Sequence, residues 1–292
     1  MDSTNLTDTI IKTINTIFQN LFSSIDNSLY SLLDDLVFIN TDILDSSFLE
    51  KILGNNFSNG LILIANALLI GFFLYYSIKL LFSYYLGIQV ENPYQVIFKS
   101  IIFGISLNFS YFICTKLLEI NFLISSSIQE IGENIFHSNI SFSQLITNIN
   151  SIVTINPSSF NIFSFDGLLK SFISVSLFNL VFSYSLRYIM VNVFILIMPF
   201  AILTLINYST SWFFKVYLKS FLSLLLLQSL VSLILLIIFS FNFSSQDIFN
   251  KLICIGGIYA LIKANSYMKE LIGGINTDIS TNFRSLTSFI KK

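Results

Sequence analysis

Charged residues are scarce in this sequence of 292 residues: Asp, Glu, Lys and Arg make up 11%, whereas hydrophobic residues make up 54%. A chain of this length with so few polar side chains does not have enough polar surface to cover a water-soluble globule. The composition therefore excludes an ordinary soluble enzyme or binding domain. It predicts an all-α, polytopic integral membrane protein, because helices satisfy their backbone hydrogen bonds within lipid.

Histidine and cysteine are almost absent, with one His137 and two widely separated cysteines, Cys114 and Cys254. This spacing gives no metal cluster, no redox pair and no disulfide framework, so we expect each cysteine to be a small apolar packing residue. The sequence also lacks a phosphate-binding glycine loop, paired intramembrane carboxylates, and the motifs of nucleophilic or zinc hydrolases. We predict no catalytic residue, metal or cofactor, and a protein that is not an enzyme.

The net charge of −1 hides an asymmetry along the chain. Residues 1–60 contain eight acidic residues and two lysines, whereas the chain from Lys215 onward contains eight basic residues and three acidic ones. Basic residues near the ends of spans favour the cytoplasmic side. We therefore expect residues 1–60 to be external and the basic tail, residues 274–292, to be cytoplasmic.

Residues 1–60 form the first predicted region, an acidic amphipathic helical one. Apolar residues recur every three or four positions from Ile10 to Leu36, with polar residues between them, which places an apolar stripe on one helix face. Two alternatives remain open for this stripe: a helix packed on its own domain, or one that lies at the membrane surface or against another subunit. The first five residues have no basic residue, so no cleavable export signal is predicted.

Residues 61–118 form a predicted transmembrane hairpin. The first span runs from Leu61 to about Tyr84 and the second from about Val96 to Leu118, each long enough for the roughly 20 residues that a bilayer core requires. Asn92 and Pro93 separate the two spans, because proline ends one helix and starts the next. Lysines flank this connection on both sides, so we place the connection in the cytoplasm.

Residues 119–167 are predicted to be an external loop region. They contain four acidic residues and no Lys or Arg, with many Ser and Asn. Within them, Ile120–Ile135 retains apolar spacing for a short helix or a re-entrant piece. The remainder is expected to consist of loops and surface-lying segments that end at Pro157 and Gly167. His137 is assigned no role.

Residues 168–273 are predicted to hold the C-terminal transmembrane helices. The apolar run 168–206 would be about 58 Å long as a helix, with Arg187 near its midpoint. It contains either two short spans with Arg187 in a turn, or a surface helix followed by one tilted or Pro199-kinked span. Charge placement favours the second solution, which gives about five spans; the first gives six. The last two spans are expected at Ser220–Phe239 and Leu252–Tyr267.

Four features in this region are candidates for a structural or conduit role. Pro199 can kink its helix and free a carbonyl, and residues 207–214 form a polar turn in which Trp212 anchors at headgroup level. The amide of Gln228 lies within a span, where it is expected to bond to another helix. Arg187 is the first candidate for function, since an ionisable group within the membrane needs a polar partner or a water-filled lumen.

The order of these features resembles the polytopic inner-membrane subunits of type IV secretion and conjugation machines, the TrbL-like conjugal transfer proteins. The resemblance covers about half of the chain and includes the acidic N-terminal region, the hairpin segment 90–128 and above all residues 186–236. The positions that carry it are Arg187, Pro199, Trp212, Phe213, Lys215, Lys219 and Gln228.

The resemblance implies a homo-oligomeric channel or scaffold in the bacterial cytoplasmic membrane, with an external N-terminus and a cytoplasmic C-terminus. The implied partners are other secretion-machine membrane subunits, cytoplasmic ATPases and the lipid bilayer. A DNA strand with its attached relaxase, or a protein, would be contacted transiently. The few Lys and Arg residues make no continuous basic groove, so no base readout is expected.

Two rival interpretations stay open. A permease or membrane subunit of a small-solute transporter predicts a polar pocket at mid-membrane near Arg187 and Gln228. A small pore-forming or immunity protein accounts for the hydrophobicity, although not for residues 119–167. The absence of a visible internal repeat of spans argues against many secondary transporters.

Overall fold

All regular secondary structure that the computed structural model describes is helical, which confirms the predicted all-α class. The described residues are 9–10, 12–17, 32–40, 47–54, 60–87, 92–152, 164–241 and 248–273. Five of the helices in these ranges are long and apolar enough to cross a bilayer. The chain is therefore a multi-pass helical membrane protein.

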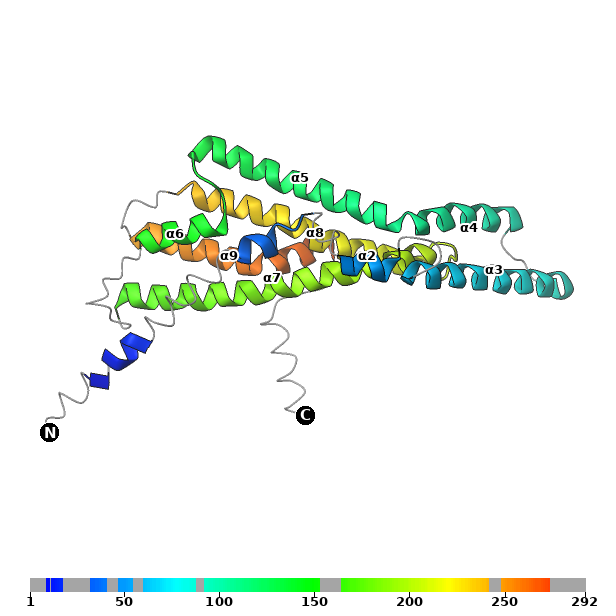
Figure 1. Cartoon of the computed structure of the whole chain (residues 1–292), viewed down its shortest axis with the longest axis horizontal. Coiled ribbons are helices and arrows are strands. Elements are labelled where there is room, and N and C mark those ends of the chain that lie inside the picture. Colours follow the sequence, from blue (N-terminus) through cyan, green and yellow to red (C-terminus); the bar gives the residue numbers. More distant parts are fainter. Residues whose placement is uncertain are drawn as a thin grey trace.

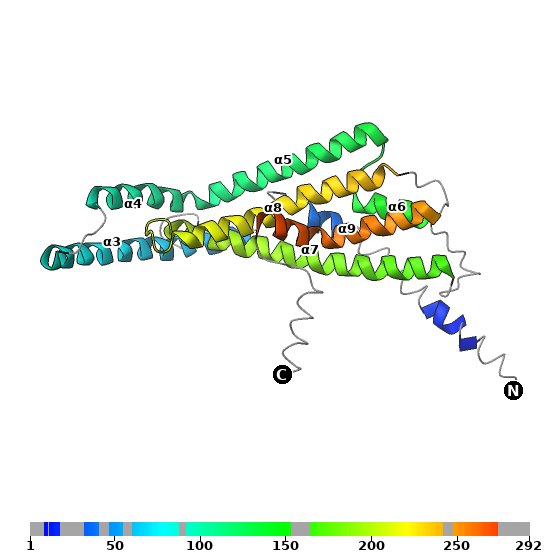
Figure 2. The same ribbon diagram turned by 180° about the vertical axis from the view of Figure 1, so that it is seen from behind.

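Two long antiparallel helices, α7 (Phe165–Leu203) and α8 (Ser211–Phe239), form the centre of the molecule (Figure 1). They are joined by a turn at residues 204–210, and such a short connection makes consecutive helices antiparallel neighbours. Helix α9 (Ile248–Ile272) packs against both, and α5 (Ser110–Phe136) packs against α8. In one half of the molecule α8 lies between α5 and α7, in both the front view and the view from behind (Figure 2).

Helices α3 (Gly60–Leu86) and α4 (Pro93–Asn108) project past the α7–α8 turn as an antiparallel pair (Figure 1). The short helix α2 (Ser47–Leu53) packs against α3 and α7. At the opposite end of the molecule, α6 (Phe142–Ile152) packs against α8. The two ends of the structure thus differ: α3 and α4 project at one end, and α6 packs against the bundle at the other.

The bundle is filled by two clusters of buried apolar side chains. One surrounds α7 and α8 near their turn and includes Val191, Phe194, Tyr217 and Phe221. The other lies toward α6 and α9 and includes Phe142, Tyr184, Leu227 and Ile258. Between helices in lipid, such contacts stabilise through close packing and interhelical hydrogen bonds, because lipid tails are as apolar as the side chains themselves.

The first predicted span is confirmed as α3, but the prediction for the second is wrong. Residues 96–118 cross the junction between α4 and α5 at Phe109, and the helix that is long enough to cross the membrane is α5. Asn92 and Pro93 start α4 as expected, since the Asn92 side-chain oxygen accepts from the Tyr94 N–H at 3.2 Å and Pro93 occupies the first turn.

The expected change from span to loop at Glu119 does not occur, because α5 continues without interruption to Phe136. The segment 120–135, predicted as a short helix or re-entrant piece, is the second part of this helix. His137 ends it in the left-handed conformation, with φ 52°, and its N–H donates to the Glu133 carbonyl. The polar composition of 119–136 therefore reflects a two-faced helix and not a loop.

The apolar run from 168 to 206 contains a single helix, α7, and no turn at Arg187. This overturns the two-span solution, and it also shows no break between a surface helix and a span. Pro199 lies inside α7, four residues before its last residue. The helix begins where the Ser164 hydroxyl accepts from the Gly167 N–H at 3.1 Å.

The last two spans are longer than predicted, because α8 begins at Ser211 and α9 extends from Ile248 to Ile272. Trp212 therefore belongs to the first turn of α8, and the polar turn ends at Thr210. Cys114 and Cys254 are free and buried, as predicted. Most of the N-terminal amphipathic stretch, between residues 18 and 31, and the basic tail 274–292 lie outside the described residues.

Candidate functional site

A chain of polar side chains crosses the interface between α5 and α8. The Asn121 amide nitrogen donates to the Gln228 Oε1 at 3.2 Å, and the Gln228 Nε2 donates to the Ser125 hydroxyl at 2.7 Å. Ser125 in turn donates to the Phe122 carbonyl at 2.8 Å. Gln228 is fully buried, so its amide bonds across to a neighbouring helix as the sequence predicted.

Arg187 lies next to this chain of polar groups, and its side chain is also fully buried. Its Nε donates to the Leu224 carbonyl of α8 at 2.7 Å, and its Nη1 donates to the Val37 carbonyl at 2.8 Å. Leu224 and Gln228 are one helical turn apart, so Arg187 and Gln228 occupy adjacent levels of the bundle. Two residues that are 41 positions apart in the sequence are thereby brought into one polar layer.

Part of this layer is unsatisfied. Among the described residues, the Arg187 Nη2 and the Asn121 Oδ1 have no hydrogen-bond partner, and Arg187 forms no ion pair with a carboxylate. A buried guanidinium that bonds only to carbonyls loses its hydration without gaining an opposite charge. Its carbonyl contacts are therefore the interactions that hold it in the bundle.

The Val37 contact ties the N-terminal region to the bundle. Residues 32–37 are helical, and Leu33 and Val37 are fully buried. A cation at the last carbonyls of a helix is favoured by the helix dipole, which fits Arg187 at Val37. From the same segment, Asp34 accepts from the N–H groups of Phe142 and Ser143 at 2.8 and 3.2 Å, at the start of α6. The segment is therefore held at two polar anchors.

The remaining predicted positions do not join this layer. Trp212 is 62% exposed in the first turn of α8, edge-on to Phe213 with ring centroids 6.1 Å apart. Lys215 and Lys219 are exposed on α8, and Pro199 lies within α7 nearer the turn. Arg187 and Gln228 are thus the two predicted residues that the fold brings together.

Asn121, Ser125 and Val37 are polar-layer members that sequence reasoning did not identify. The sequence signal was available for the first two, because Asn121 and Ser125 are four residues apart and so share one face of a helix. Because a loop was predicted from Glu119 onward, the shared helix face of Asn121 and Ser125 was not predicted. Val37 contributes a backbone carbonyl, for which no side-chain signal exists.

A second polar feature lies on the outward face of α5. Cys114, Leu118, Asn121 and Ser125 are buried toward the bundle. The opposite face carries Lys116, Glu119, Ser127, Glu130 and Asn134, together with the exposed Leu123. Most of these polar residues are exposed, and we call them the α5 polar face.

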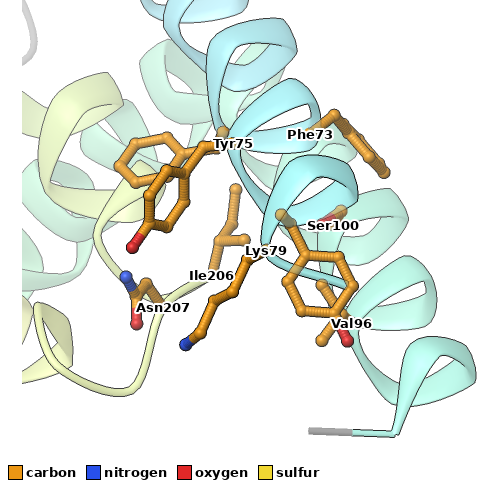
Figure 3. A pocket seen from close by; sticks show the side chains of 9 residues that line it. Phe73, Tyr75, Lys79, Val96, Ser100, Ile206 and Asn207 are labelled. Atoms are coloured by element: carbon orange, nitrogen blue, oxygen red, sulfur yellow. The ribbon is translucent and has the colours of Figure 1, made fainter. Parts of the chain in front are cut away.

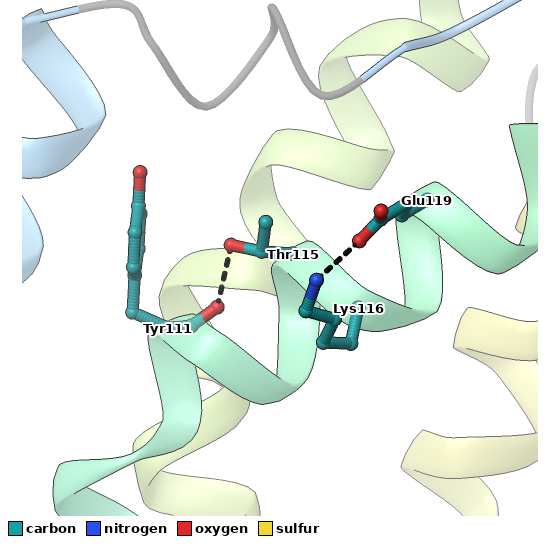
Figure 4. A network of polar contacts seen from close by, with 4 residues as sticks. All are labelled: Tyr111, Thr115, Lys116 and Glu119. Carbon is teal, nitrogen blue, oxygen red and sulfur yellow. Dashed lines mark hydrogen bonds and ion pairs between the residues drawn. The ribbon is translucent and has the colours of Figure 1, made fainter.

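The α5 polar face contains an exposed ion pair. The Lys116 ammonium lies 2.6 Å from the Glu119 Oε2, and the two side chains are 52% and 45% exposed (Figure 4). The same figure shows the Thr115 hydroxyl, which donates to the Tyr111 carbonyl of its own helix at 3.0 Å. Thr115 thus satisfies its hydroxyl locally, whereas Lys116 and Glu119 point away from the bundle.

A third polar contact joins α3 to the end of α4. Asn66 donates to the Asn108 Oδ1 at 2.9 Å, and the Asn108 amide nitrogen donates to the Gly104 carbonyl at 2.8 Å and to Asn66 at 3.3 Å. An asparagine that bonds back to its own helix competes with the backbone ladder. This competition coincides with the break at Phe109.

The α5–α8 polar chain makes a quantitative prediction. Replacing Asn121 and Gln228 with alanine, singly and together, is expected to give a coupling free energy of about 0.6–1.7 kcal/mol in a double-mutant cycle. Unfolding in mixed micelles measures it. A cycle that pairs Asn121→Ala with Ser143→Ala, a residue bonded to Asp34 instead, serves as control. Coupling as large in the control cycle as in the Gln228 cycle would contradict the assignment.

The described part of the chain holds no group of three or more His, Cys, Asp or Glu side chains suited to a metal ion. Comparison with protein-family models, curated proteins and solved structures finds no match for this chain. The class is therefore defined by the fold itself: a polytopic α-helical membrane protein with a buried polar layer and with exposed charged residues on α5.

Proposed function

We propose that this chain is a membrane subunit of a bacterial type IV secretion or conjugation machine, in which several copies surround a path for the transported substrate. In this proposal the α5 polar face lines the path. The observation that supports the proposal best is the contrast between the two outer sides of one bundle, which are formed by α5 and α7.

The outer side of α7 is apolar. Leu168, Phe172, Val175, Phe178 and Phe182 are 43–70% exposed and recur every three or four residues, so they form one stripe. A stripe of large exposed apolar side chains on a membrane-crossing helix is suited to lipid. The α7 side therefore faces the acyl chains in our proposal.

The part of the α5 polar face from Ser127 to Asn134 lies at the level of this stripe. On α8, Leu224 contacts Arg187 of α7, and Gln228 contacts Asn121 of α5. Helices α7 and α8 are antiparallel. The part of α8 that follows Leu224 therefore lies beside the part of α7 that precedes Arg187, which carries the apolar stripe. The same part of α8 lies beside the segment of α5 that runs from Asn121 to Glu130. The apolar stripe of α7 and the polar residues Ser127, Glu130 and Asn134 of α5 thus lie on different sides of the bundle at similar depth.

Energetics disfavour lipid on the α5 side. A Lys or Asp at the centre of a membrane helix costs about 2.5–3.5 kcal/mol, so ionisable residues in spans usually face a water-filled space or a polar partner. When several copies of this chain assemble with α7 outward and α5 inward, the apolar stripe of α7 contacts lipid and the α5 polar face contacts water. Such a ring is homo-oligomeric and encloses a polar path, as expected for a conduit.

The charges on this face also fit a transient contact with the substrate. Lys116 is accompanied by Glu119 and Glu130, so the face offers no continuous basic groove that would hold DNA tightly. The sequence contains no nucleotide-binding loop. In the proposal the driving energy therefore comes from partner ATPases.

Site-directed labelling tests the direction of the α5 face. In a background with Cys114 and Cys254 replaced by alanine, Ser127→Cys is expected to react with a membrane-impermeant maleimide in the assembled machine. Val175→Cys, on the apolar stripe of α7 and 70% exposed in the isolated chain, is the matched control and is expected to stay unlabelled. Labelling of Val175→Cys with protection of Ser127→Cys would reverse the two faces and contradict the proposal.

The secretion function itself is tested by deletion. Removing the gene should abolish plasmid transfer and leave growth and solute uptake unchanged, and the wild-type gene should restore transfer. Loss of solute uptake instead would favour the permease alternative. That alternative assigns Arg187 and Gln228 to a solute pocket, but both side chains are fully buried by protein. Neighbouring genes without a secretion ATPase, relaxase or peptidoglycan hydrolase would also contradict the proposal.

A further inference from the structure

A cleft opens between α3, α4 and the α7–α8 turn, at the end of the molecule where α3 and α4 project. Nine residues line it, and they are mostly aromatic or polar, among them Tyr75, Tyr76, Lys79 and Asn207 (Figure 3). Its cavity volume is about 40 Å³, which admits a few small polar atoms and not a whole substrate. The cleft is therefore suited to part of a ligand whose remainder lies elsewhere.

An apolar groove of about 340 Å³ continues from this cleft along α3 and α4. The two cavities share Phe73 and Ser100, and the groove runs from there past Ile101 and Gly104 to Phe109. The distance from Ser100 to Phe109 along the helix is about 13 Å. A groove of this kind on a lipid-exposed helix pair does not stay empty in a bilayer, and an acyl chain matches its length and its apolar lining.

The cleft presents hydrogen-bond donors. Lys79 is exposed, and within the described residues its ammonium makes no hydrogen bond or ion pair. The Asn207 Oδ1 is already engaged by the N–H and hydroxyl of Ser209, at 3.1 and 2.8 Å, so the Asn207 amide offers its N–H₂ group. Figure 3 shows both side chains at the mouth of the cleft. Two donors without a carboxylate suit the oxygens of a phosphate.

The charged side chains on the described helices and turn around the cleft are of one sign. Helices α3, α4 and α8 and the α7–α8 turn contain no Asp or Glu and four lysines: Lys79, Lys99, Lys215 and Lys219. Lys99 lies over the ring of Tyr208 in the turn, 4.4 Å from its centroid, so this lysine fixes the turn against α4. The described helices and turn around the cleft thus attract an anion and carry no competing acidic side chain.

We propose that this cleft and groove bind an anionic phospholipid, with the phosphate at Lys79 and Asn207 and one acyl chain in the groove between α3 and α4. The site does not depend on the proposed secretion function, since it requires only that the chain lies in a bilayer. It joins the projecting helix pair to the α7–α8 turn through one ligand.

Lipid binding to the full-length protein in detergent, measured by native mass spectrometry, tests this proposal. The probes are dioleoyl phosphatidylglycerol, dioleoyl phosphatidylcholine and glycerol 3-phosphate, which carries the anionic group without acyl chains. Lys79→Gln is expected to weaken phosphatidylglycerol binding about fivefold. Lys219→Gln is the matched control, because it removes an exposed lysine of the same end outside the cleft, and it is expected to change binding less than twofold.

A second pair of variants tests the groove. Gly104→Leu fills it from α4, where a Cβ would lie 3.4 Å from the Leu69 Cδ2, and is expected to lower phosphatidylglycerol binding at least fivefold. Gly71→Leu makes the same change on α3 where a Cβ meets nothing within 4 Å, and is expected to leave binding unchanged. Circular dichroism of all variants separates loss of lipid from loss of fold.

Four outcomes would overturn the proposal. Equal binding of phosphatidylcholine would remove the anionic preference, and equal loss in Lys219→Gln would indicate diffuse attraction instead of a site. Glycerol 3-phosphate binding as tight as the lipid would assign the cleft to a free phosphate. Unchanged binding in a folded Gly104→Leu variant would place the acyl chain outside the groove.

Discussion

Replacing Arg187 with alanine is expected to destabilise the bundle by at least about 3 kcal/mol. The substitution removes the Arg187 donors to the Leu224 and Val37 carbonyls and leaves a cavity where a large, fully buried side chain stood. The Leu224 carbonyl keeps the helical bond from the Gln228 N–H, whereas loss of the donor to the Val37 carbonyl costs about 1–3 kcal/mol, and the cavity adds to this cost. Unfolding in mixed micelles, followed by circular dichroism, measures the loss.

Arg187→Met is the matched variant, because it keeps most of the volume and removes the charge. Replacing a buried charge by an apolar side chain of similar size is often tolerated, so Arg187→Met should be less destabilising than Arg187→Ala. Lys215→Ala, at an exposed position, should change stability by less than about 0.5 kcal/mol. Equal stability of Arg187→Ala and the wild type would show that its carbonyl contacts contribute nothing.

The same contact predicts that residues 32–37 loosen when Arg187 is lost. Val37 is fully buried, so Val37→Cys should resist maleimide labelling in an otherwise cysteine-free chain with Arg187 present. Combined with Arg187→Ala, it should become reactive, because only the Asp34 anchor then remains of the two that hold the segment. Continued protection would show that apolar packing and the Asp34 anchor hold the segment without Arg187.

Introducing leucine at Gly257 is expected to disrupt the contact between α8 and α9 by about 1–3 kcal/mol or more. A Cβ at Gly257 would lie 2.6 Å from Cγ1 and 2.7 Å from Cδ1 of Ile238, so this side chain must move within the packed interface to make room for a leucine. Small residues at helix interfaces in membranes allow this close approach. A lower midpoint of thermal unfolding, measured on the purified protein, is the expected result.

The adjacent residue provides the control for this prediction. A Cβ at Gly256 meets nothing within 4 Å, so Gly256→Leu has the same chemistry and the same helix but no collision. It should be close to wild type in stability, or slightly more stable because leucine favours helix over glycine. Equal destabilisation by both variants would mean that helix backbone effects dominate, and not the contact with Ile238.

Much of the fold follows from local sequence. The helical class, the first span and the start of α4 at Asn92 and Pro93 were predicted because apolar runs and proline act within a few residues. The predictions were wrong where the composition of a segment suggests one structure and its packing against a neighbouring helix produces another. Residues 119–136 are polar enough to resemble a loop, and only packing of one face on α8 makes them a continuous helix.

The candidate site was predictable in part. Gln228 and Arg187 stood out because amides and charges are rare in spans, and both proved to be fully buried. Their partners could not be inferred, since Leu224 and Val37 contribute backbone carbonyls that every residue possesses. The single helix α7 was not among the predicted solutions, because an apolar run of this length was divided either into two short spans or into a surface helix and one span.

The sequence alone determined that this chain belongs in a membrane as helices, because its polar residues are too few for water and its apolar runs are long enough for lipid. Only the tertiary structure decided which sides of those helices are inside. It placed Arg187 against the carbonyls of α8 and of residues 32–37, and it left Lys116 and Glu119 on the outer face of α5. The physical reason is that the hydropathy of a segment is a sum over its own residues. Burial and hydrogen bonding depend instead on which neighbouring helix packs against each face of the segment.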